Sequence, residues 1–185
     1  MTAATLIPSY TAGTWDIDPV HSDVSFSVRH MMVSKVRGRF GSFSGQFTSA
    51  EDITGSSVTA TIDATTIDTN NEQRDNHIRS ADFFDVVNHP TWTFTSNGVR
   101  VDDDELFLDG ELTIKGVTRP VIMKLEVEGF GPDAYGGTRA GFSAATTINR
   151  NDFGVDISMP LDGGGVVVGD KVTINLEIEA VLRTA

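Results

Sequence analysis

Apolar and polar residues alternate with a period of two along most of this 185-residue chain. Between residues 24 and 29, for example, valine and phenylalanine alternate with serine and arginine. Period two places successive side chains on opposite faces of a β-strand, so the pattern predicts strands with one apolar and one polar face. Such one-sided strands are typical of antiparallel sheets. We expect about eight strands, most of them in residues 24–29, 36–47, 58–64, 92–96, 106–114, 121–127, 140–148 and 172–180.

The segment VRGRFGSFSGQF, residues 36–47, changes the parity of its apolar positions partway. Val36 and Phe40 occupy even positions, whereas Phe43 and Phe47 occupy odd ones. A shift of one residue turns every later side chain to the other face of the sheet. We therefore expect one long strand with a glycine-assisted bulge or bend near Gly41, of the kind that sharply curved barrels need.

The alternation is interrupted most clearly in TNNEQRDNHIRSADFFDVVNHP, residues 69–90. Asn70 or Asn71 can cap a helix that starts near Glu72, because an asparagine side chain accepts from the free N–H groups of a first helical turn. Pro90 ends whatever precedes the next strand. The segment predicts one short helix, lying over an open end of the sheet.

A β-sandwich and a β-barrel both satisfy this pattern. An even number of strands, strands of about ten residues and few helices favour a closed sheet. A barrel of eight strands can hold one ligand in its interior. The apolar face also carries small residues, including Ala60, Gly110 and Ala144. These residues either leave free volume or let the opposite walls approach, and the sequence leaves both alternatives open.

The amino-acid composition limits the classes of partner that the protein is expected to bind. Acidic residues number 26 against 14 basic ones, and the net charge of −12 repels phosphate backbones, so no nucleic-acid partner is expected. The chain has no cysteine. The first residues lack Lys and Arg, and Pro8 interrupts their apolar run, so no secretory signal is recognised. No run reaches the roughly 20 apolar residues of a membrane span. These features predict a cytoplasmic protein without stable membrane insertion.

The cluster at residues 74–79 allows two interpretations. Asp75 and His77 are the residue types of a general-base pair, in which a carboxylate orients an imidazole. They lie only two residues apart, however, with no evident nucleophile nearby except common serines, which favours a helix start with surface ion pairs. A metal site would need His21, His30, His77 and His89, but their spacing matches no ligand motif and no cysteine assists. We therefore expect no metal and no cofactor.

Two further polar residues have both a structural and a ligand-binding interpretation. His30 continues the apolar register of Val24, Phe26 and Val28, so it points inward near the end of a strand. It either closes the barrel with hydrogen bonds or contacts a ligand head group. Arg150 lies in the turn INRNDFG, where we favour a structural hydrogen-bonding role over a ligand contact.

Four ordered motifs resemble one family. They are the opening DPVHSDVSFSVRHMMVSKVRGRFGSFSGQF, the segment RDNHIRSADFFDVVNHPTWTF, then GELTIKGVTRPV and INRNDFG. Through them the chain is identified as a member of the YceI-like family of lipocalin-like, polyisoprenoid-binding proteins. The resemblance covers residues 15–182. It implies an all-β fold, namely an extended eight-stranded antiparallel lipocalin-like barrel with a short helix over one end, and frequent homodimers. We expect residues 1–13 to be a flexible N-terminal segment and residues 14–185 to form the barrel domain.

The resemblance also implies an elongated apolar cavity that takes a long-chain isoprenoid or fatty lipid, such as an isoprenoid quinone or a carrier lipid, for storage, shielding or delivery. The function expected is binding without catalysis. The alternatives are a hydrolase or isomerase that acts through Arg74, Asp75 and His77, and a fully packed barrel that serves only as an interaction module. The predicted ligand-binding residues are Val24, Phe26, Val28, His30, Phe40, Val58, Ile62, Phe83, Phe84, Trp92, Phe94, Leu108, Phe142 and Ile174. Arg74, Asp75, His77, Arg79 and Arg150 are predicted to lie at the rim or to meet a head group.

Overall fold

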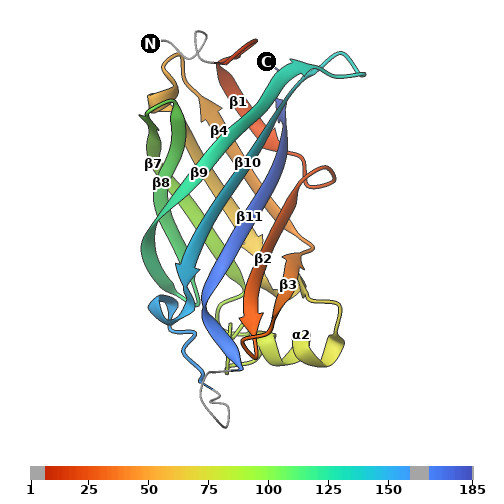
Figure 1. The fold of residues 1–185 in the computed structure, drawn as a ribbon. Coiled ribbons are helices and arrows are strands. Elements are labelled where there is room, and N and C mark those ends of the chain that lie inside the picture. The colour runs from red at the N-terminus through yellow and green to blue at the C-terminus, as the bar shows by residue number, and fades with distance from the viewer. Residues whose placement is uncertain (1–6, 159–166, 185) are drawn as a thin grey trace.

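In the computed structural model, which describes residues 7–158 and 167–184, strand segments join into one antiparallel sheet that closes on itself (Figure 1). The sheet order is β1-β4-β5-β7-β8-β9-β10-β11-β2-β3-β6, and β1 pairs with β11 to complete the ring. The segments are β1 (Gly13–Ile17), β2 (Asp23–His30), β3 (Ser34–Phe40), β4 (Phe43–Ser49), β5 (Ser57–Asp63), β6 (Ile67–Asp68), β7 (Thr91–Asp102), β8 (Glu105–Ile114), β9 (Val117–Pro132), β10 (Thr138–Asn149) and β11 (Val168–Leu182).

Six of these segments combine in pairs, so the barrel has eight strands. β1 and β2 both pair with β11, and they also pair with β4 and β3, respectively. β4 and β3 in turn pair with β5 and β6. Each pair of segments therefore occupies one position in the ring, beside the five continuous strands β7 to β11. The prediction of an all-β, eight-stranded antiparallel barrel is confirmed.

The parity change in residues 36–47 occurs at Gly41, where the sequence predicts a bulge or bend. The expected bend near Gly41 is present, but it divides the segment into two strands, β3 and β4, that end and begin on either side of Gly41 and Ser42. The neighbouring strand breaks at the same level, in the 3-10 helix η2 (Ala64–Thr66). Gly41 N donates to Thr66 O over 3.1 Å, and Asp63 N donates to Ser42 O over 3.0 Å. The two breaks thus satisfy each other's backbone groups, which a single strand viewed in sequence cannot reveal.

The two ends of the barrel differ in structure (Figure 1). The helix end, at the bottom of Figure 1, contains the β2–β3 turn (residues 31–33), α2 (Glu72–Arg79), the following loop (residues 80–90) and the 3-10 helix η3 (Arg150–Phe153). The hairpin end contains the 3-10 helix η1 (Ile53–Gly55), the β7–β8 turn (residues 103–104) and the β9–β10 turn (residues 133–137).

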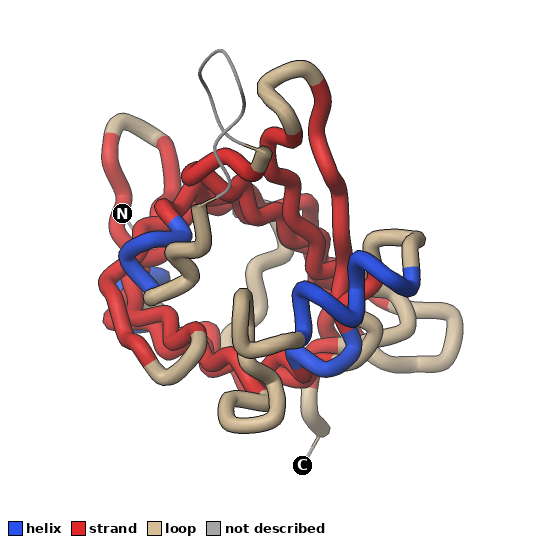
Figure 2. Tube along the Cα trace, turned by 90° about the horizontal axis from the view of Figure 1, so that it is seen from below, coloured by secondary structure: helices blue, strands red, loops and turns tan. Residues whose placement is uncertain are grey.

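The short helix is present where the sequence predicts it. α2 begins at Glu72, and Asn71 rather than Asn70 caps it by accepting from Arg74 N over 2.9 Å. Figure 2, which views the helix end, shows α2 at one side of the ring of strands and η3 at the opposite side. In the described part of the chain, no helix has the length and apolar character that crossing a bilayer requires.

The N-terminal segment was expected to be flexible up to residue 13, and residues 1–6 lie outside the described residues. In the described part, Ile7 is buried, and the Tyr10 hydroxyl donates to Ala50 O over 2.7 Å. Gly13 already begins β1. Residues 7–13 therefore pack on the hairpin end, and the domain boundary at residue 14 stays a prediction.

Candidate ligand-binding cavities

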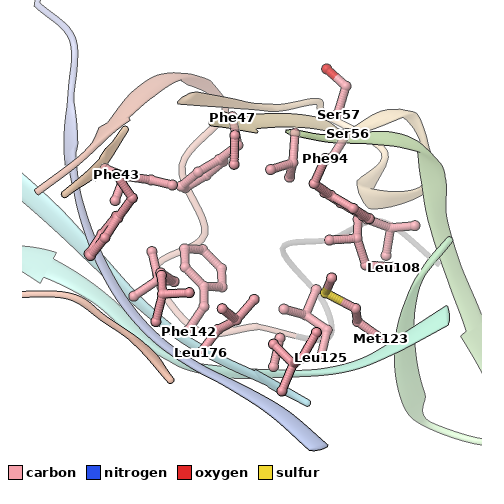
Figure 3. A pocket seen from close by; sticks show the side chains of 18 of the residues that line it. Phe43, Phe47, Ser56, Ser57, Phe94, Leu108, Met123, Leu125, Phe142 and Leu176 are labelled. Atoms are coloured by element: carbon pink, nitrogen blue, oxygen red, sulfur yellow. The ribbon is translucent and has the colours of Figure 1, made fainter. Parts of the chain in front are cut away.

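An upper cavity of about 150 Å³ occupies the half of the barrel toward the hairpin end. Its walls are apolar apart from Tyr10 and a few serines. Figure 3 shows Phe47 from β4, Phe94 from β7 and Phe142 from β10 directed into the same space. Alternation on each strand explains this arrangement, because every second side chain of a barrel strand points inside. A cavity of this kind offers a ligand dry apolar contact and few hydrogen bonds.

A lower cavity of about 230 Å³ lies at the helix end. Apolar walls from β2, β11 and residues 83–84 enclose it, but its lining differs from that of the upper cavity in one respect. The lining includes five basic residues and no aspartate or glutamate among the described residues. The basic residues are Arg29, His30, Arg74, His77 and Arg150. The lower cavity therefore combines an apolar wall with positive charge.

Aromatic rings separate the two cavities. Phe26 and Trp92 line both of them, Phe40 lines only the upper one, and Phe84 only the lower one. Ring centroids are 4.8 Å apart for Phe40 and Trp92, and 4.9 Å apart for Phe84 and Trp92. The sequence predicted one elongated cavity; the structure has two adjoining cavities whose walls share Phe26 and Trp92. We call Phe26, Phe40, Phe84 and Trp92 the aromatic divider.

Glycines opposite the large rings account for part of this packing. A Cβ added to Gly38 would lie 2.5 Å from Phe26 Cζ, and one added to Gly110 would lie 2.5 Å from Phe94 Cζ. Both rings thus lie directly over a glycine of the neighbouring strand. The space beside Gly110 that a side chain would occupy is filled by the ring of Phe94. Ala60 and Ala144, in contrast, line the upper cavity. Ala60 and Ala144 therefore border free volume, whereas the small size of Gly110 accommodates a ring from the adjacent strand.

All fourteen residues predicted to bind ligand line at least one of the two cavities. Their contact with a ligand remains a prediction. The upper cavity contains Val24, Phe26, Phe40, Val58, Ile62, Trp92, Phe94, Leu108, Phe142 and Ile174. The lower cavity contains Phe26, Val28, His30, Phe83, Phe84 and Trp92. The fully packed barrel considered as an alternative does not agree with these cavities.

Arg74 and Asp75 belong to one hydrogen-bonded network around Thr69. Arg74 donates from Nη2 to Thr69 O over 2.6 Å and from Nε to Thr69 Oγ1 over 2.8 Å. The Thr69 hydroxyl and N–H both donate to the buried carboxylate of Asp75. The network ties the start of α2 to the residue that follows β6. Arg74 also lines the lower cavity. Its hydrogen bonds to Thr69 therefore leave part of its side chain facing that cavity.

His77 and Asp75 contact different groups. His77 Nε2 lies 2.9 Å from Asp82 Oδ2, and both side chains are about half exposed. Its ring also meets Phe83 edge-on, with centroids 5.0 Å apart. Arg79 donates to Thr65 O over 3.0 Å and to Ile67 O over 3.3 Å, and it lines neither cavity. The geometry therefore does not assemble Asp75 and His77 as a carboxylate–imidazole pair.

Arg150 is buried and bonded chiefly to backbone carbonyls, as expected for a structural role. It donates from Nη1 to Val155 O over 2.7 Å and from Nε to Gly169 O over 2.9 Å. Asp170 Oδ1 lies 3.4 Å from Nη2. These contacts join η3 to the start of β11 across the rim of the helix end. Arg150 also lines the lower cavity, so the structural role leaves a ligand contact open.

Trp92 carries a buried indole N–H with no hydrogen-bond partner among the described residues. A buried unpaired donor costs about 1–3 kcal/mol. The packing of Trp92 against Phe40 and Phe84 places this donor within the aromatic divider. In contrast, Trp15 is fully buried outside both cavities and donates to Ser49 Oγ over 2.8 Å.

Several lining residues were missed by sequence reasoning. Ile7 and Tyr10 precede the first strand, in a segment taken as flexible. Phe130 breaks the parity of β9, because the β9–β10 register shifts next to Gly141. The glycine-rich sequence around residues 129–131 was the only available signal for this irregularity. In residues 7–158 and 167–184, no group of three or more His, Cys, Asp or Glu side chains is placed to hold a metal ion.

The closed eight-stranded barrel with an apolar interior defines a lipocalin-like class of protein. A family model described as the YceI-like domain matches residues 15–180. The chain therefore belongs to the YceI-like family. It is 42% identical over 141 residues to "Protein YceI" of Escherichia coli O157:H7, covering 76% of this chain and 74% of that protein. It is 39% identical over 145 residues to a "UPF0312 protein" of Pseudomonas aeruginosa (strain LESB58), covering 78% and 76%, respectively.

Solved structures have the same fold. The Campylobacter jejuni YCEI protein superposes with a TM-score of 0.72 at 28% identity, covering 96% of this chain and 100% of that one. BcnA of Burkholderia cenocepacia gives a TM-score of 0.76 at 24% identity, covering 88% of this chain and 98% of that one. A polyisoprenoid binding domain from Saccharophagus degradans gives 0.70 at 14% identity, covering 94% and 100%. The last two likenesses show the fold alone.

Proposed function

We propose that the barrel binds a long-chain isoprenoid or a similar amphiphilic lipid, with the chain in the upper cavity and the polar head in the lower one. The observation that carries this proposal is the contrast between the two cavities. The upper one is lined almost entirely by apolar side chains, whereas the lower one adds five basic residues. An amphiphile with a long apolar chain and a polar or anionic head matches both environments at once.

The favourable free energy of binding comes from burial of the lipid's hydrocarbon chain. Each CH₂ group removed from water contributes about 0.8 kcal/mol, so a long chain gains much from a preformed apolar cavity. The polar residues then determine which way the lipid lies, because an anionic head is stabilised beside Arg74 and Arg150 and not beside the phenylalanines of the upper cavity. The hydrocarbon chain of the lipid must pass the aromatic divider. Trp92 and its neighbours therefore shift when a ligand longer than one cavity enters.

The comparisons support the lipid as the class of ligand. The Saccharophagus degradans structure with the same fold is described as a polyisoprenoid binding domain. This chain has the same fold and belongs to the YceI-like family. Storage, shielding or delivery of the lipid is the role we propose, with no bond made or broken. The separate contacts of Asp75 and His77 favour binding over the hydrolase or isomerase alternative.

Extraction of the purified protein with organic solvent, followed by mass spectrometry, tests the proposal. We expect one long-chain lipid per barrel, recovered unmodified. Incubation of the lipid-stripped protein with a long-chain isoprenoid alcohol or quinone should then leave the compound unchanged. A shortened or rearranged product would support the enzyme alternative, and failure to retain any long-chain compound would contradict lipid binding.

The two tryptophans provide an independent measurement. In a Trp15→Phe variant, Trp92 is the sole tryptophan, and it lies in the aromatic divider between the cavities. Its fluorescence should change saturably when the isoprenoid is added. The matched Trp92→Phe variant retains only Trp15, which lines neither cavity, and its fluorescence should change little. Equal responses from the two variants would contradict passage of the ligand through the divider.

A homodimer is part of the same proposal, as the family resemblance implies. Sedimentation equilibrium of the lipid-stripped and lipid-loaded protein tests it directly. A monomer under both conditions would remove the dimer and leave the proposed cavity binding unaffected.

A further inference from the structure

The β2–β3 turn at the helix end exposes apolar side chains. Met31, Met32 and Val33 are 45%, 53% and 84% exposed, respectively. Backbone φ is +50° at Met31 and +63° at Met32, a left-handed conformation that favours glycine and asparagine. Two methionines in such a turn are unfavourable both for backbone strain and for solvation. A turn that serves only to connect two strands does not require either cost.

The position of the turn is fixed by backbone hydrogen bonds. Met31 N donates to Val167 O over 2.8 Å, and Val33 N donates to His30 O over 3.2 Å. Arg29 and His30, which immediately precede the turn, line the lower cavity. The exposed apolar turn therefore stands beside the cavity that faces the helix end. Val87, in the loop after α2 at this end, is also 89% exposed.

Positive charge surrounds the turn. Residues 24–50 contain four arginine and lysine residues and no aspartate or glutamate, in a chain whose net charge is −12. Arg29, Lys35 and Arg37 are exposed, and Arg29 is paired with Lys35 in the β2–β3 register. None of the three takes part in an ion pair with another described residue. The fourth, Arg39, lies opposite Asp68 in the register with β6.

We propose that the helix end docks on an anionic lipid bilayer through this turn. Met31, Met32 and Val33 enter the interface between head groups and acyl chains, while the exposed cations Arg29, Lys35 and Arg37 contact lipid phosphates. Apolar side chains flanked by cations are the combination that binds anionic bilayer surfaces. The inference rests on the proposed function and extends it, because docking here would bring the lower cavity against the bilayer. A water-insoluble lipid could then exchange without crossing solvent.

The acidity of the rest of the chain does not prevent this orientation. The most acidic turn, residues 102–105, lies at the hairpin end, away from the helix end (Figure 1). β11 connects the two ends with 15 residues, a rise of about 50 Å along the strand. The Debye length at physiological ionic strength is about 8 Å, so the acidic end is screened even in a tilted barrel. Glu72 and Asp82 also lie at the helix end, so the attraction to an anionic surface comes from the part of this end that carries Arg29, Lys35 and Arg37.

The test measures flotation of lipid-stripped protein with vesicles. Vesicles contain either 70% phosphatidylcholine and 30% phosphatidylglycerol or phosphatidylcholine alone. We expect the protein to bind the anionic vesicles at least tenfold more tightly. Replacing Met31→Asn and Met32→Asn together should reduce binding at least tenfold, and asparagine suits the positive φ at both positions. Lys35→Glu with Arg37→Glu should reduce it as much, and provides a second variant in case the first does not fold.

Matched controls lie elsewhere on the barrel. Tyr135→Asn removes an 89% exposed apolar side chain at the hairpin end, and Lys124→Glu reverses an exposed strand lysine. Both should bind anionic vesicles within twofold of the parent protein. Controls that lose binding as strongly as the turn variants would overturn the proposal, as would turn variants that bind normally or a parent protein that does not float.

The same experiments separate docking from the proposed function. Flotation uses lipid-stripped protein, so it does not depend on a bound ligand. Long-chain lipid in the extract without flotation would overturn docking and leave lipid binding intact. Flotation without any extractable or titratable lipid would have the opposite meaning. If sedimentation shows a dimer that the Met31→Asn/Met32→Asn variant dissociates, and vesicles do not bind, a second copy covers the turn and the proposal fails.

Discussion

The arginines at the two ends of the barrel have different partners. Toward the hairpin end they bind carboxylates. Arg139 Nη1 lies 2.8 Å from Asp18 Oδ2 and 3.0 Å from Glu179 Oε1, and Arg183 Nη2 lies 2.6 Å from Asp16 Oδ1.

At the helix end the arginines donate mainly to backbone carbonyls. Arg74 bonds Thr69 O, Arg79 bonds Thr65 O, and Arg150 bonds Val155 O and Gly169 O. Of these three, only Arg150 also approaches a carboxylate of the residues that the structure describes, at 3.4 Å from Asp170 Oδ1. The same residue type thus joins structural elements at both ends, by different means.

The consequence concerns charge. A carboxylate neutralises a guanidinium, whereas a carbonyl satisfies its N–H groups and leaves its charge in place. The helix end therefore keeps positive charge beside the lower cavity, while the hairpin end has little to offer an anionic group. The hydrogen-bonding cluster that fixes α2 can thus serve the fold and attract a head group at the same time. Four predictions test this difference between the ends.

The largest effect is expected at Phe84, in the lower cavity. Its ring contacts Trp92 with centroids 4.9 Å apart. Phe84→Asp places a carboxylate in an apolar wall, where an unpaired charge is costly and remains protonated or displaces its neighbours. We expect the variant to lose all retained lipid, as measured by extraction and mass spectrometry.

The matched variant is Phe84→Leu, which keeps the wall apolar. It should retain lipid at close to the level of the parent protein. A Phe84→Asp protein that melts at the parent temperature and copurifies with the same amount of lipid would exclude Phe84 from the binding site.

The second prediction compares Arg150→Ala with Arg139→Ala. Removal of Arg150 leaves the buried carbonyl of Val155 and the partly buried carbonyl of Gly169 without their donor. Hydrogen bonds from charged donors contribute about 1.5–3 kcal/mol each, so we expect the free energy of unfolding to fall by about 3 kcal/mol. Denaturant titration measures it.

Arg139→Ala should destabilise less, because its ion pairs are partly exposed. The two variants should also differ in their response to salt. In 1 M NaCl the loss for Arg139→Ala shrinks because salt screens its carboxylate partners, whereas the loss for Arg150→Ala persists. Equal salt dependence would show that the two ends use the same kind of interaction.

The sequence predicted the walls of the site better than its polar rim. Period-two alternation fixes the face on which Phe26, Trp92 and Phe142 lie, and all three point inside. The height at which rings from different strands meet depends on strand register, which alternation does not determine. The aromatic divider was therefore not predictable. The bend at Gly41 was predictable from the change of parity, but its hydrogen-bond partner Thr66, in η2, was not.

The polar rim was harder because its partners are backbone atoms. Nothing in the residue types around Arg150 indicates that its acceptor is the carbonyl of Gly169, 19 residues away. The cap at Asn71 was predictable, since a cap depends only on local sequence. Local and periodic features were thus accessible from sequence, and contacts fixed by loop geometry were not.

The third prediction concerns Arg74. Arg74→Ala removes two hydrogen bonds to Thr69 and should lower the free energy of unfolding of lipid-free protein by about 2 kcal/mol. Differential scanning calorimetry of lipid-stripped protein measures the change in melting temperature. Arg74→Lys should recover only part of it, because a lysine ammonium lacks the planar array of donors. An unchanged melting temperature together with weaker lipid binding would instead assign Arg74 to the head group.

The smallest effect is expected at Asp18, which follows β1 and pairs with Arg139, one of the arginines toward the hairpin end. Arg139 donates to the Asp18 carboxylate and holds the pKa of Asp18 well below its usual 3.8, and His21 contributes a second hydrogen bond. A lowered folded-state pKa means that ionised Asp18 stabilises the fold fully above pH of about 4, where the unfolded chain is also ionised. This stabilisation is lost as the pH falls through the folded-state pKa.

Asp18→Asn should therefore lower the melting temperature by a few degrees at pH 7, and the difference from the parent protein should shrink progressively below pH of about 4. Asp103→Asn, in the exposed β7–β8 turn, is the control and should change the melting temperature little at any pH. A difference for Asp18→Asn that stays constant down to pH 2 would mean that the carboxylate acts through its shape and hydrogen bonds and not through its charge, and the contrast between the two ends would then not be electrostatic.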